Sequence, residues 1–213
     1  PSGDKAVAII TADGLRSFSQ VLGYSLSPLS ERRNSRAFAA LRGNGTVVAW
    51  GNPESGGDTR LVDSELGSQK TVQIFSSGRA FAALNENGGV LSWGNQQWGG
   101  NSDSVKDQIS SGVRTIASNY YAFAAIKEDG SVVSWGTFSF GGDISSVSSK
   151  LKSGILNVFR TDRAFAALKD DGSVVTWGDP DYGGNSTDVA DGLSSGVIRI
   201  YGNQKAFAAL KDD

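Results

Sequence analysis

Chemistry in this chain must come from acidic, basic, hydroxyl, amide and aromatic side chains, because its 213 residues include no Cys, His or Met. That absence removes thiol nucleophiles, imidazole bases and soft metal ligands together. The remaining polar residues mostly recur with a fixed spacing, and none forms an isolated constellation typical of catalysis. We therefore expect a protein that is not an enzyme and that binds no cofactor and no metal ion.

Large aromatic residues directly before a Gly-Gly pair are the first candidates for a binding surface. They are Trp98, Phe140 and Tyr182, and Ser55 stands at the equivalent place earlier in the chain. Rigid rings in loops on one face could bind a partner protein or stack on a sugar, because they give contact area at low entropic cost. The alternative is that each ring covers a short helix of its own repeat.

A second row of candidates is basic. Arg36, Arg79, Arg163 and Lys205 each precede an alanine-rich segment, and Tyr121 takes this place once. A basic ring around one rim would suit an acidic partner protein. The alternative is a set of solvated side chains, since the chain carries 20 basic and 22 acidic residues.

Asp58, Asn101, Asp143 and Asn185 also recur, and their oxygens could in principle bind a cation. Calcium needs about six or more oxygen ligands from a compact loop, and no repeat has the spacing of a known calcium loop. We expect these four side chains instead to cap the first turn of a short helix.

A repeat that fills most of the chain must position these residues. It starts at Ala37, Ala80, Ala122, Ala164 and Ala206, and these starts lie 43, 42, 42 and 42 residues apart. A fixed period of this length is typical of propellers and solenoids, in which each unit stacks on its neighbours.

Each repeat combines a hairpin, a short helix and a further strand. Residues 80–84 and 90–94 are apolar runs joined through Asn87-Gly88, a pair that supplies the backbone angles of a tight hairpin turn. Val105 and Ile109, four residues apart, predict an amphipathic helix before a strand at 113–118. We expect an all-β protein of tandem repeats of about 42 residues, forming a small or incomplete β-propeller with three antiparallel strands and one short helix per blade.

One Trp per repeat is expected in the core, because aromatic side chains dominate buried area. These residues are Trp50, Trp93, Trp135 and Trp177.

The two ends of the chain depart from the repeat. Residues 1–36 are interpreted as a degenerate N-terminal capping repeat with an irregular connection, because 6–20 aligns with the hairpin only up to its turn. Residues 37–213 are interpreted as four full propeller-type repeats plus a final partial repeat, in one structural body. Since the chain begins at Pro1 and ends within a repeat, we expect it to be part of something longer.

Residues 37–213 resemble a known family of repeats. The order of a strand, Ala-Phe-Ala-Ala-Leu, Asp-Gly-Ser-Val-Val-Thr-Trp-Gly and an aromatic-Gly loop is similar to repeats of the regulator-of-chromosome-condensation superfamily of β-propellers, in its short bacterial and algal form. This chain lacks the His and the Gln-Leu-Gly that are frequent in that family. The resemblance implies a propeller, and the limited number of repeats here predicts that the ring is small or incomplete.

Net charge and hydropathy limit the classes of partner that the chain could bind. The net charge of −2 gives no basic field for nucleic acid, and no apolar run approaches the roughly 20 residues of a spanning helix. We therefore expect no nucleic acid and no membrane-spanning segment of the chain's own.

The sequence favours a non-catalytic scaffold that binds other protein subunits, as an accessory subunit of a larger assembly. A membrane-associated or photosynthetic complex would be one setting. The alternative is a secreted lectin-like or inhibitor-like binding propeller, with a glycan as the less favoured ligand. The compartment stays open, with an organellar or extracytoplasmic one favoured.

Overall fold

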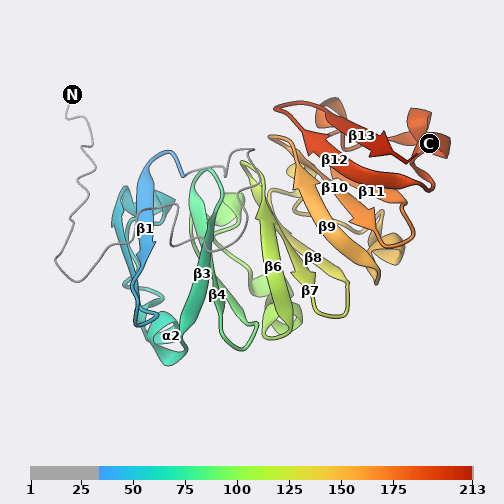
Figure 1. Cartoon of the computed structure of the whole chain (residues 1–213). Helices are drawn as coiled ribbons and strands as arrows, with labels where there is room; N and C mark the ends of the chain where they lie inside the picture. The colour runs from blue at the N-terminus through green and yellow to red at the C-terminus, as the bar shows by residue number, and fades with distance from the viewer. Residues whose placement is uncertain (1–33, 213) are drawn as a thin grey trace, which may run out of the picture.

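A computed structural model of the chain describes residues 34–212. Over this range the strands form five separate antiparallel sheets that stand side by side in an open arc (Figure 1). The expected all-β, propeller-like architecture is therefore confirmed. The capping repeat expected over residues 1–36 falls almost wholly outside the described residues and stays a prediction.

The sheets, numbered blades 1 to 5, follow the chain order. Blade 1 contains β1 (Ala37–Leu41) and β2 (Val47–Gly51). Blades 2 to 4 have three strands each, with the alanine-rich strand in the middle. Their strands are β3 (Thr71–Ser76), β4 (Ala80–Asn85) and β5 (Val90–Gly94), then β6 (Val113–Ser118), β7 (Ala122–Lys127) and β8 (Val132–Gly136), then β9 (Ile155–Arg160), β10 (Ala164–Lys169) and β11 (Val174–Gly178). Blade 5 pairs β12 (Val197–Gly202) with β13 (Phe207–Lys211).

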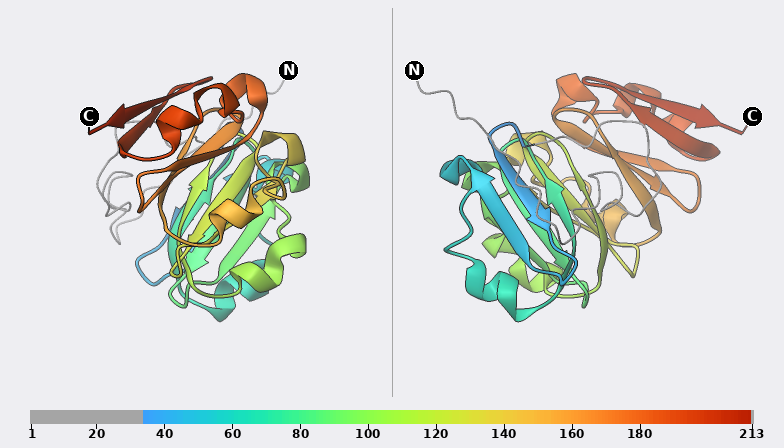
Figure 2. Two further views of the ribbon diagram at one scale, coloured as in Figure 1. Left: turned by 90° about the vertical axis from the view of Figure 1, so that its right-hand side faces the viewer. Right: turned by 60° about the vertical axis from the view of Figure 1, so that its left-hand side comes forward.

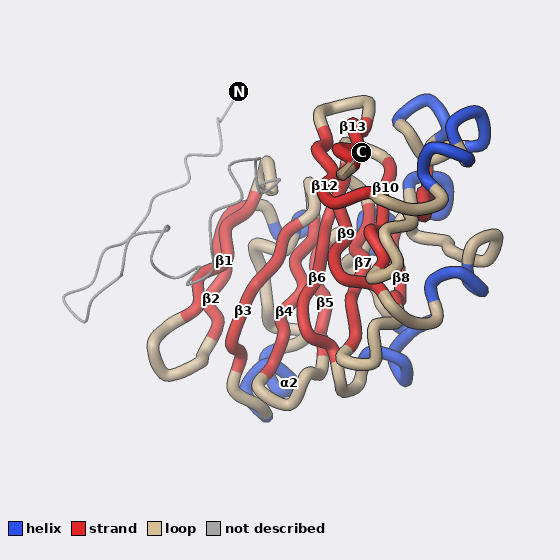
Figure 3. Tube along the Cα trace, turned by 45° about the vertical axis from the view of Figure 1, so that its right-hand side comes forward, coloured by secondary structure: helices blue, strands red, loops and turns tan. Residues whose placement is uncertain are grey.

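Successive blades are turned relative to one another, so blade 5 lies at the opposite end of the arc from blade 1 (Figure 2). The helical segments lie at the periphery of the strands (Figure 3). Among residues 34–212, no helix has the length and apolar character that crossing a membrane would need.

The helical segments differ in kind from the predicted short amphipathic helix. Between residues 34 and 212, only α2 (Asp63–Ser68) is an α-helix. Its counterparts are 3-10 segments, namely η3 (Asp103–Ile109), η5 (Ser148–Leu151), η7 (Thr187–Val189) and η8 (Asp191–Leu193). These sequences are short and rich in Ser and Asp, and such pieces commonly adopt 3-10 geometry. The predicted anchor Ile109 is buried, and so are Leu66 and Leu151 at the equivalent places in α2 and η5.

A second set of 3-10 turns precedes the Gly-Gly pairs at 56–57, 99–100, 141–142 and 183–184. They are η1 (Pro53–Ser55), η2 (Gln96–Trp98), η4 (Phe138–Phe140) and η6 (Pro180–Tyr182). Each turn ends at a glycine in the left-handed conformation, which a residue with a side chain rarely adopts.

The middle strand of each of blades 2 to 4 packs against both neighbouring blades. In β7, Ala122, Ala124 and Ile126 belong to the core shared with blade 4, whereas Phe123 and Ala125 belong to the core shared with blade 2. This follows from the strand period of two, which points successive side chains to opposite faces. The small alanines let the sheets approach closely, so the Ala-Phe-Ala-Ala-Leu pattern is a packing pattern.

A glycine of the preceding blade packs against a stacked Phe–Trp pair. In blade 3, Phe123 and Trp135 are paired across β7 and β8, with ring centroids 5.2 Å apart. Gly99 of blade 2 lies against this stack, and a Cβ there would be 2.5 Å from the Phe123 ring. The Trp135 indole Nε1 donates to the Gly99 carbonyl oxygen at 3.0 Å. The same link recurs from Trp93 to Gly56 and from Trp177 to Gly141.

The predicted core position of the Trp row is confirmed for Trp93, Trp135 and Trp177, which are buried. Trp50 of blade 1 is only half-buried, and its Nε1 has no hydrogen-bond partner among the described residues.

Replacing Gly141 by Ala should lower the free energy of unfolding by about 3 kcal/mol. Its φ of 101° disfavours a side chain, and the new Cβ would lie 2.6 Å from the Phe165 ring. Gly67→Ala is the matched control, because Gly67 lies in helix α2 with open space around it. That change should stabilise the protein by about 0.5–1 kcal/mol. Urea denaturation measures both, and effects of the same sign would contradict this account of the blade joint.

Replacing Trp135 by Phe should cost about 3 kcal/mol, because it leaves the Gly99 carbonyl without its indole donor and leaves a cavity beside Phe123. Trp50→Phe removes an indole without such a bond and should cost about 1 kcal/mol. Urea denaturation, followed by far-ultraviolet circular dichroism, measures the change in the free energy of unfolding for both variants. Equal losses would show that the hydrogen bond between blades contributes little.

Candidate functional site

The predicted aromatic and basic rows meet on one surface. The guanidinium carbon of Arg79 lies 4.4 Å from the centroid of the Trp98 ring. The same atom of Arg163 lies 4.9 Å from the Phe140 centroid and 4.6 Å from the Tyr182 centroid. These are cation–π distances, so the two rows form one group of contacts.

Two adjacent tyrosines at the first turn of blade 3 join the rows. Tyr121 lies 4.5 Å from Trp98 and 4.8 Å from Phe140, centroid to centroid, and Tyr120 lies 5.1 Å from Trp98. At the far end, Nζ of Lys205 is 5.7 Å from the Tyr182 ring. We call this surface the rim band; its members are Arg79, Trp98, Tyr120, Tyr121, Phe140, Arg163, Tyr182 and Lys205.

The rim band is continuous from blade 2 to blade 5, and all its members except the exposed Lys205 are half-buried. Each loop aromatic packs against the turn of the following blade. These contacts favour a shared surface over the alternative in which each ring covers the helix of its own repeat.

Arg36 is the one predicted site residue outside the rim band. It is exposed, and no aromatic ring among residues 34–212 contacts its guanidinium. The reason is local: the first repeat has Ser55 where later repeats have an aromatic residue, and Ser55 is buried.

In blades 1 to 4, a buried polar side chain in the first turn fixes the loop that precedes the Gly-Gly pair. In blade 3, Oδ1 of Asn119 accepts from the amides of Tyr121 and Ala122, each at 2.8 Å. Its Nδ2 donates to the carbonyl of Phe140 at 2.7 Å. The equivalent residues and acceptors are Asn34 with Ser55, Ser77 with Trp98 and Thr161 with Tyr182.

We did not single out this position from the sequence, because it varies among Asn, Ser and Thr. The signal that could have found it is a small polar residue three places before each starting alanine, present at 34, 77, 119, 161 and 203.

A chain of backbone hydrogen bonds joins these turns across the whole arc. The amide of Ser35 donates to Gly78, Gly78 to Tyr120, Tyr120 to Asp162 and Asp162 to Gln204, at 2.9–3.1 Å. The rim band therefore rests on turns that are tied to one another and to their own loops.

The four recurring Asx residues do not cap helices, which corrects that prediction. Each side-chain oxygen accepts from the amide two residues later, forming a turn before the helix begins; the pairs are Asp58 with Arg60, Asn101 with Asp103, Asp143 with Ser145 and Asn185 with Thr187. The Arg60 side chain also hydrogen-bonds Asp58 and lowers the pKa of that carboxyl to about 2. Within the described part of the chain, no three acidic side chains gather to hold a metal ion.

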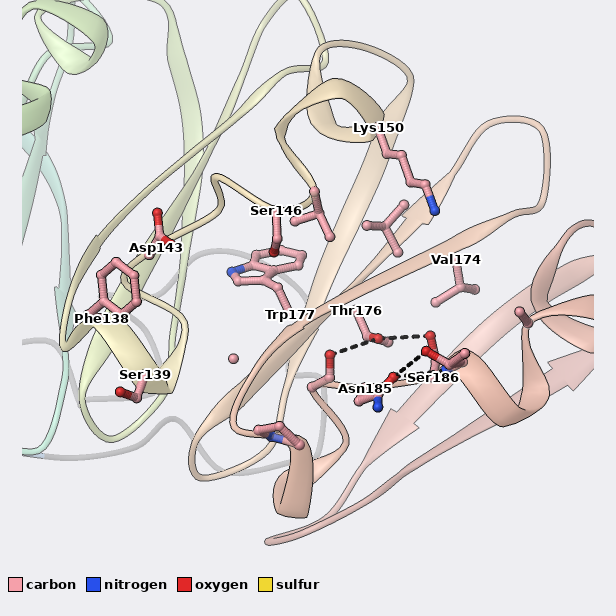
Figure 4. A pocket seen from close by; sticks show the side chains of 17 residues that line it. Phe138, Ser139, Asp143, Ser146, Lys150, Val174, Thr176, Trp177, Asn185 and Ser186 are labelled. Atoms are coloured by element: carbon pink, nitrogen blue, oxygen red, sulfur yellow. Dashed lines mark hydrogen bonds between the residues drawn. The ribbon is translucent and has the colours of Figure 1, made fainter.

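Clefts lie between neighbouring blades, away from the rim band. The larger, about 600 Å³, lies between blades 3 and 4, with Phe138 on one side of Trp177 and Lys150 on the other (Figure 4). Thr176 Oγ1 bonds there to Ser186 Oγ at 2.9 Å. A second cleft of about 430 Å³ lies one repeat earlier, and no predicted site residue lines either one. We attribute the clefts to the repeated stacking of blades.

No protein-family model and no curated protein sequence matches the chain. Among solved structures it is similar to yeast RCC1 (Prp20), seen bound to Kap60, with a TM-score of 0.56, 20% identity and coverage of 84% of this chain and 52% of that one. It is also similar to Prp20p of Saccharomyces cerevisiae, described with its binding to Gsp1p and histones, with a TM-score of 0.53, 20% identity and coverage of 84% and 53%. The chain therefore has the fold of RCC1-type propeller blades and spans about half the length of these two proteins.

Replacing Asn119 by Ala should lower the free energy of unfolding by about 3 kcal/mol, because two backbone amides and the Phe140 carbonyl lose their partner in a buried turn. Asn203→Ala is the control, since Asn203 makes the equivalent turn bonds while exposed. Its cost should stay within about 0.5–1 kcal/mol. Thermal and urea denaturation compare the two, and a small loss for the Asn119 variant would contradict the anchoring role.

Proposed function

We propose that the chain is a non-catalytic scaffold that binds another protein through the rim band, as an accessory subunit of a larger assembly. The observation that carries the proposal is the continuous row of half-buried rings and guanidinium groups from Arg79 to Tyr182. Trp, Tyr and Arg are the residues that most often dominate the binding energy of protein interfaces.

The rim band is held ready for binding. Its loops are anchored by buried turn residues and its turns by the backbone bonds between blades. Side chains that are already ordered lose little conformational entropy when a partner binds, so more of the contact energy appears as affinity.

The fold similarity supports protein binding in general. Yeast Prp20 is described as binding Kap60, Gsp1p and histones. With about half of its length covered here, those particular partners are not carried over to this chain.

The absence of catalysis is part of the proposal. The chain contains no His and no Cys. The hydroxyls of Thr176 and Ser134 in the clefts form hydrogen bonds within the protein, to Ser186 and to backbone carbonyls. Neither hydroxyl lies beside a base that could activate it.

The lectin-like alternative is favoured less by the geometry. Sugars stack on the open face of an aromatic ring, whereas Arg79 lies over Trp98, and Arg163 lies between Phe140 and Tyr182. Cations on these rings suit a partner protein with acidic and apolar groups better than a neutral sugar. An inhibitor-like role, which also means binding a protein, fits the same surface.

Affinity capture with the tagged chain from its native source tests the proposal. Replacing Trp98, Phe140 and Tyr182 by Ala should reduce the recovery of a stoichiometric protein partner at least tenfold, because interface anchors are lost. Phe138→Ala is the control, since Phe138 is 72% exposed and lines a cleft outside the rim band.

Quantitative mass spectrometry of the captured proteins provides the measurement. Equal recovery by the triple variant and the control would overturn the proposal. Glycan-array binding that disappears in the triple variant would support the lectin-like alternative.

A further inference from the structure

The arginines of the rim band differ in whether a carboxylate pairs with them. At blade 4, Nη1 of Arg163 lies 3.6 Å from a carboxylate oxygen of Asp179. At blade 2, Arg79 forms no ion pair with any residue in the range 34–212. Among the described residues, therefore, no carboxylate pairs with the positive charge of Arg79 on this surface.

One position in the repeat accounts for the difference. The amide of Asp179 donates to the carbonyl of Arg163 at 3.0 Å, and the amide of Asn95 donates to the carbonyl of Arg79 at 2.9 Å. Residue 95 thus stands in the same register as residue 179. Blade 4 supplies a carboxylate there, and blade 2 supplies a neutral amide.

The guanidinium of Arg79 is not fully paired within the described part of the chain. Its Nε is buried and has no hydrogen-bond partner among residues 34–212. Such atoms are rare in folded proteins, because an unpaired buried polar group costs free energy. At the same place Arg79 is stacked on Trp98, which holds a planar guanidinium in one orientation.

We propose that Arg79, Trp98 and Asn95 form a site for an Asp or Glu side chain of the partner protein. This inference rests on the proposed function and adds the chemistry of the contact. A carboxylate is the planar anion that a guanidinium binds best, and the neutral Asn95 can accommodate it where an Asp would repel it. The half-buried setting limits screening by solvent.

The repeat also explains why this site lies at blade 2. The charge of Arg163 is already compensated by Asp179, so an incoming carboxylate would gain less there. Lys205 is exposed and makes only a distant contact with Tyr182, so it offers a less ordered cation. Arg79 is therefore the residue of the rim band that selects an acidic side chain of the partner.

Moving the Asp carboxylate from position 179 of blade 4 to position 95 of blade 2 tests the inference. Both substitutions introduce a residue type that the repeat already has at this position. Fluorescence anisotropy measures binding of a fluorescein-labelled oligoglutamate to the whole chain at low salt, with oligoglutamine as the uncharged control. Asn95→Asp should raise the Kd for oligoglutamate about fivefold, and Asp179→Asn should lower it about fivefold. The double variant N95D/D179N keeps the net charge and so controls for long-range attraction. In this variant Arg79→Gln should no longer weaken binding, because the site has moved to blade 4.

Failure of this inference is distinguishable from failure of the proposed function. If the wild-type chain does not prefer oligoglutamate over oligoglutamine, or if Asn95→Asp binds it as tightly as wild type, the inference is overturned. The loss of the captured partner in the aromatic variants would still stand as separate support for the scaffold. Circular dichroism of each variant confirms that a change in Kd does not come from unfolding.

Discussion

The close approach of a glycine to the Phe–Trp pair of the next blade is the constraint on which the rest of the structure depends. Gly99 fits against Phe123 because it has no side chain, and its carbonyl accepts the indole N–H of Trp135. The left-handed backbone at this glycine also ends the preceding 3-10 turn. The residue just before it, Trp98, is thereby brought to the rim, so the joint between blades also positions the surface aromatic.

The rim band is consequently a result of blade stacking, and its residue types differ from blade to blade. The glycine and the Phe–Trp pair recur unchanged in the four full repeats, and the turn residue is always small and polar. The residue before the glycine and the residue at positions 95 and 179 are free to change, because neither forms the joint. Differences among blades in ring type and counter-charge can therefore alter binding without altering the fold.

Much of the fold was predictable because its signals are local. These signals are the repeat period, the Asn-Gly and Asp-Gly turns and the Ala-Phe-Ala-Ala-Leu strand, and the structure confirms the elements they indicate.

The site was only half predictable. The aromatic and basic rows were visible in the sequence, but their meeting was not, since the contact of Arg163 with Phe140 joins different blades. The turn anchor Asn119 was hidden because its bond to Phe140 spans 21 residues and other repeats use Ser or Thr there. The helix type was misjudged because the short, Ser- and Asp-rich segments follow an apolar spacing that α and 3-10 geometry both accommodate.

The backbone bonds from Ser35 through Gly78, Tyr120 and Asp162 to Gln204 join peptide groups only, without regard to side-chain type. Any unit of the repeat can therefore follow any other and find the same partner. Unequal recombination between copies of the gene segment would add or remove whole blades while leaving every joint intact. The arc is thus a form whose length can evolve in steps of one repeat, each step extending or shortening the surface presented to a partner.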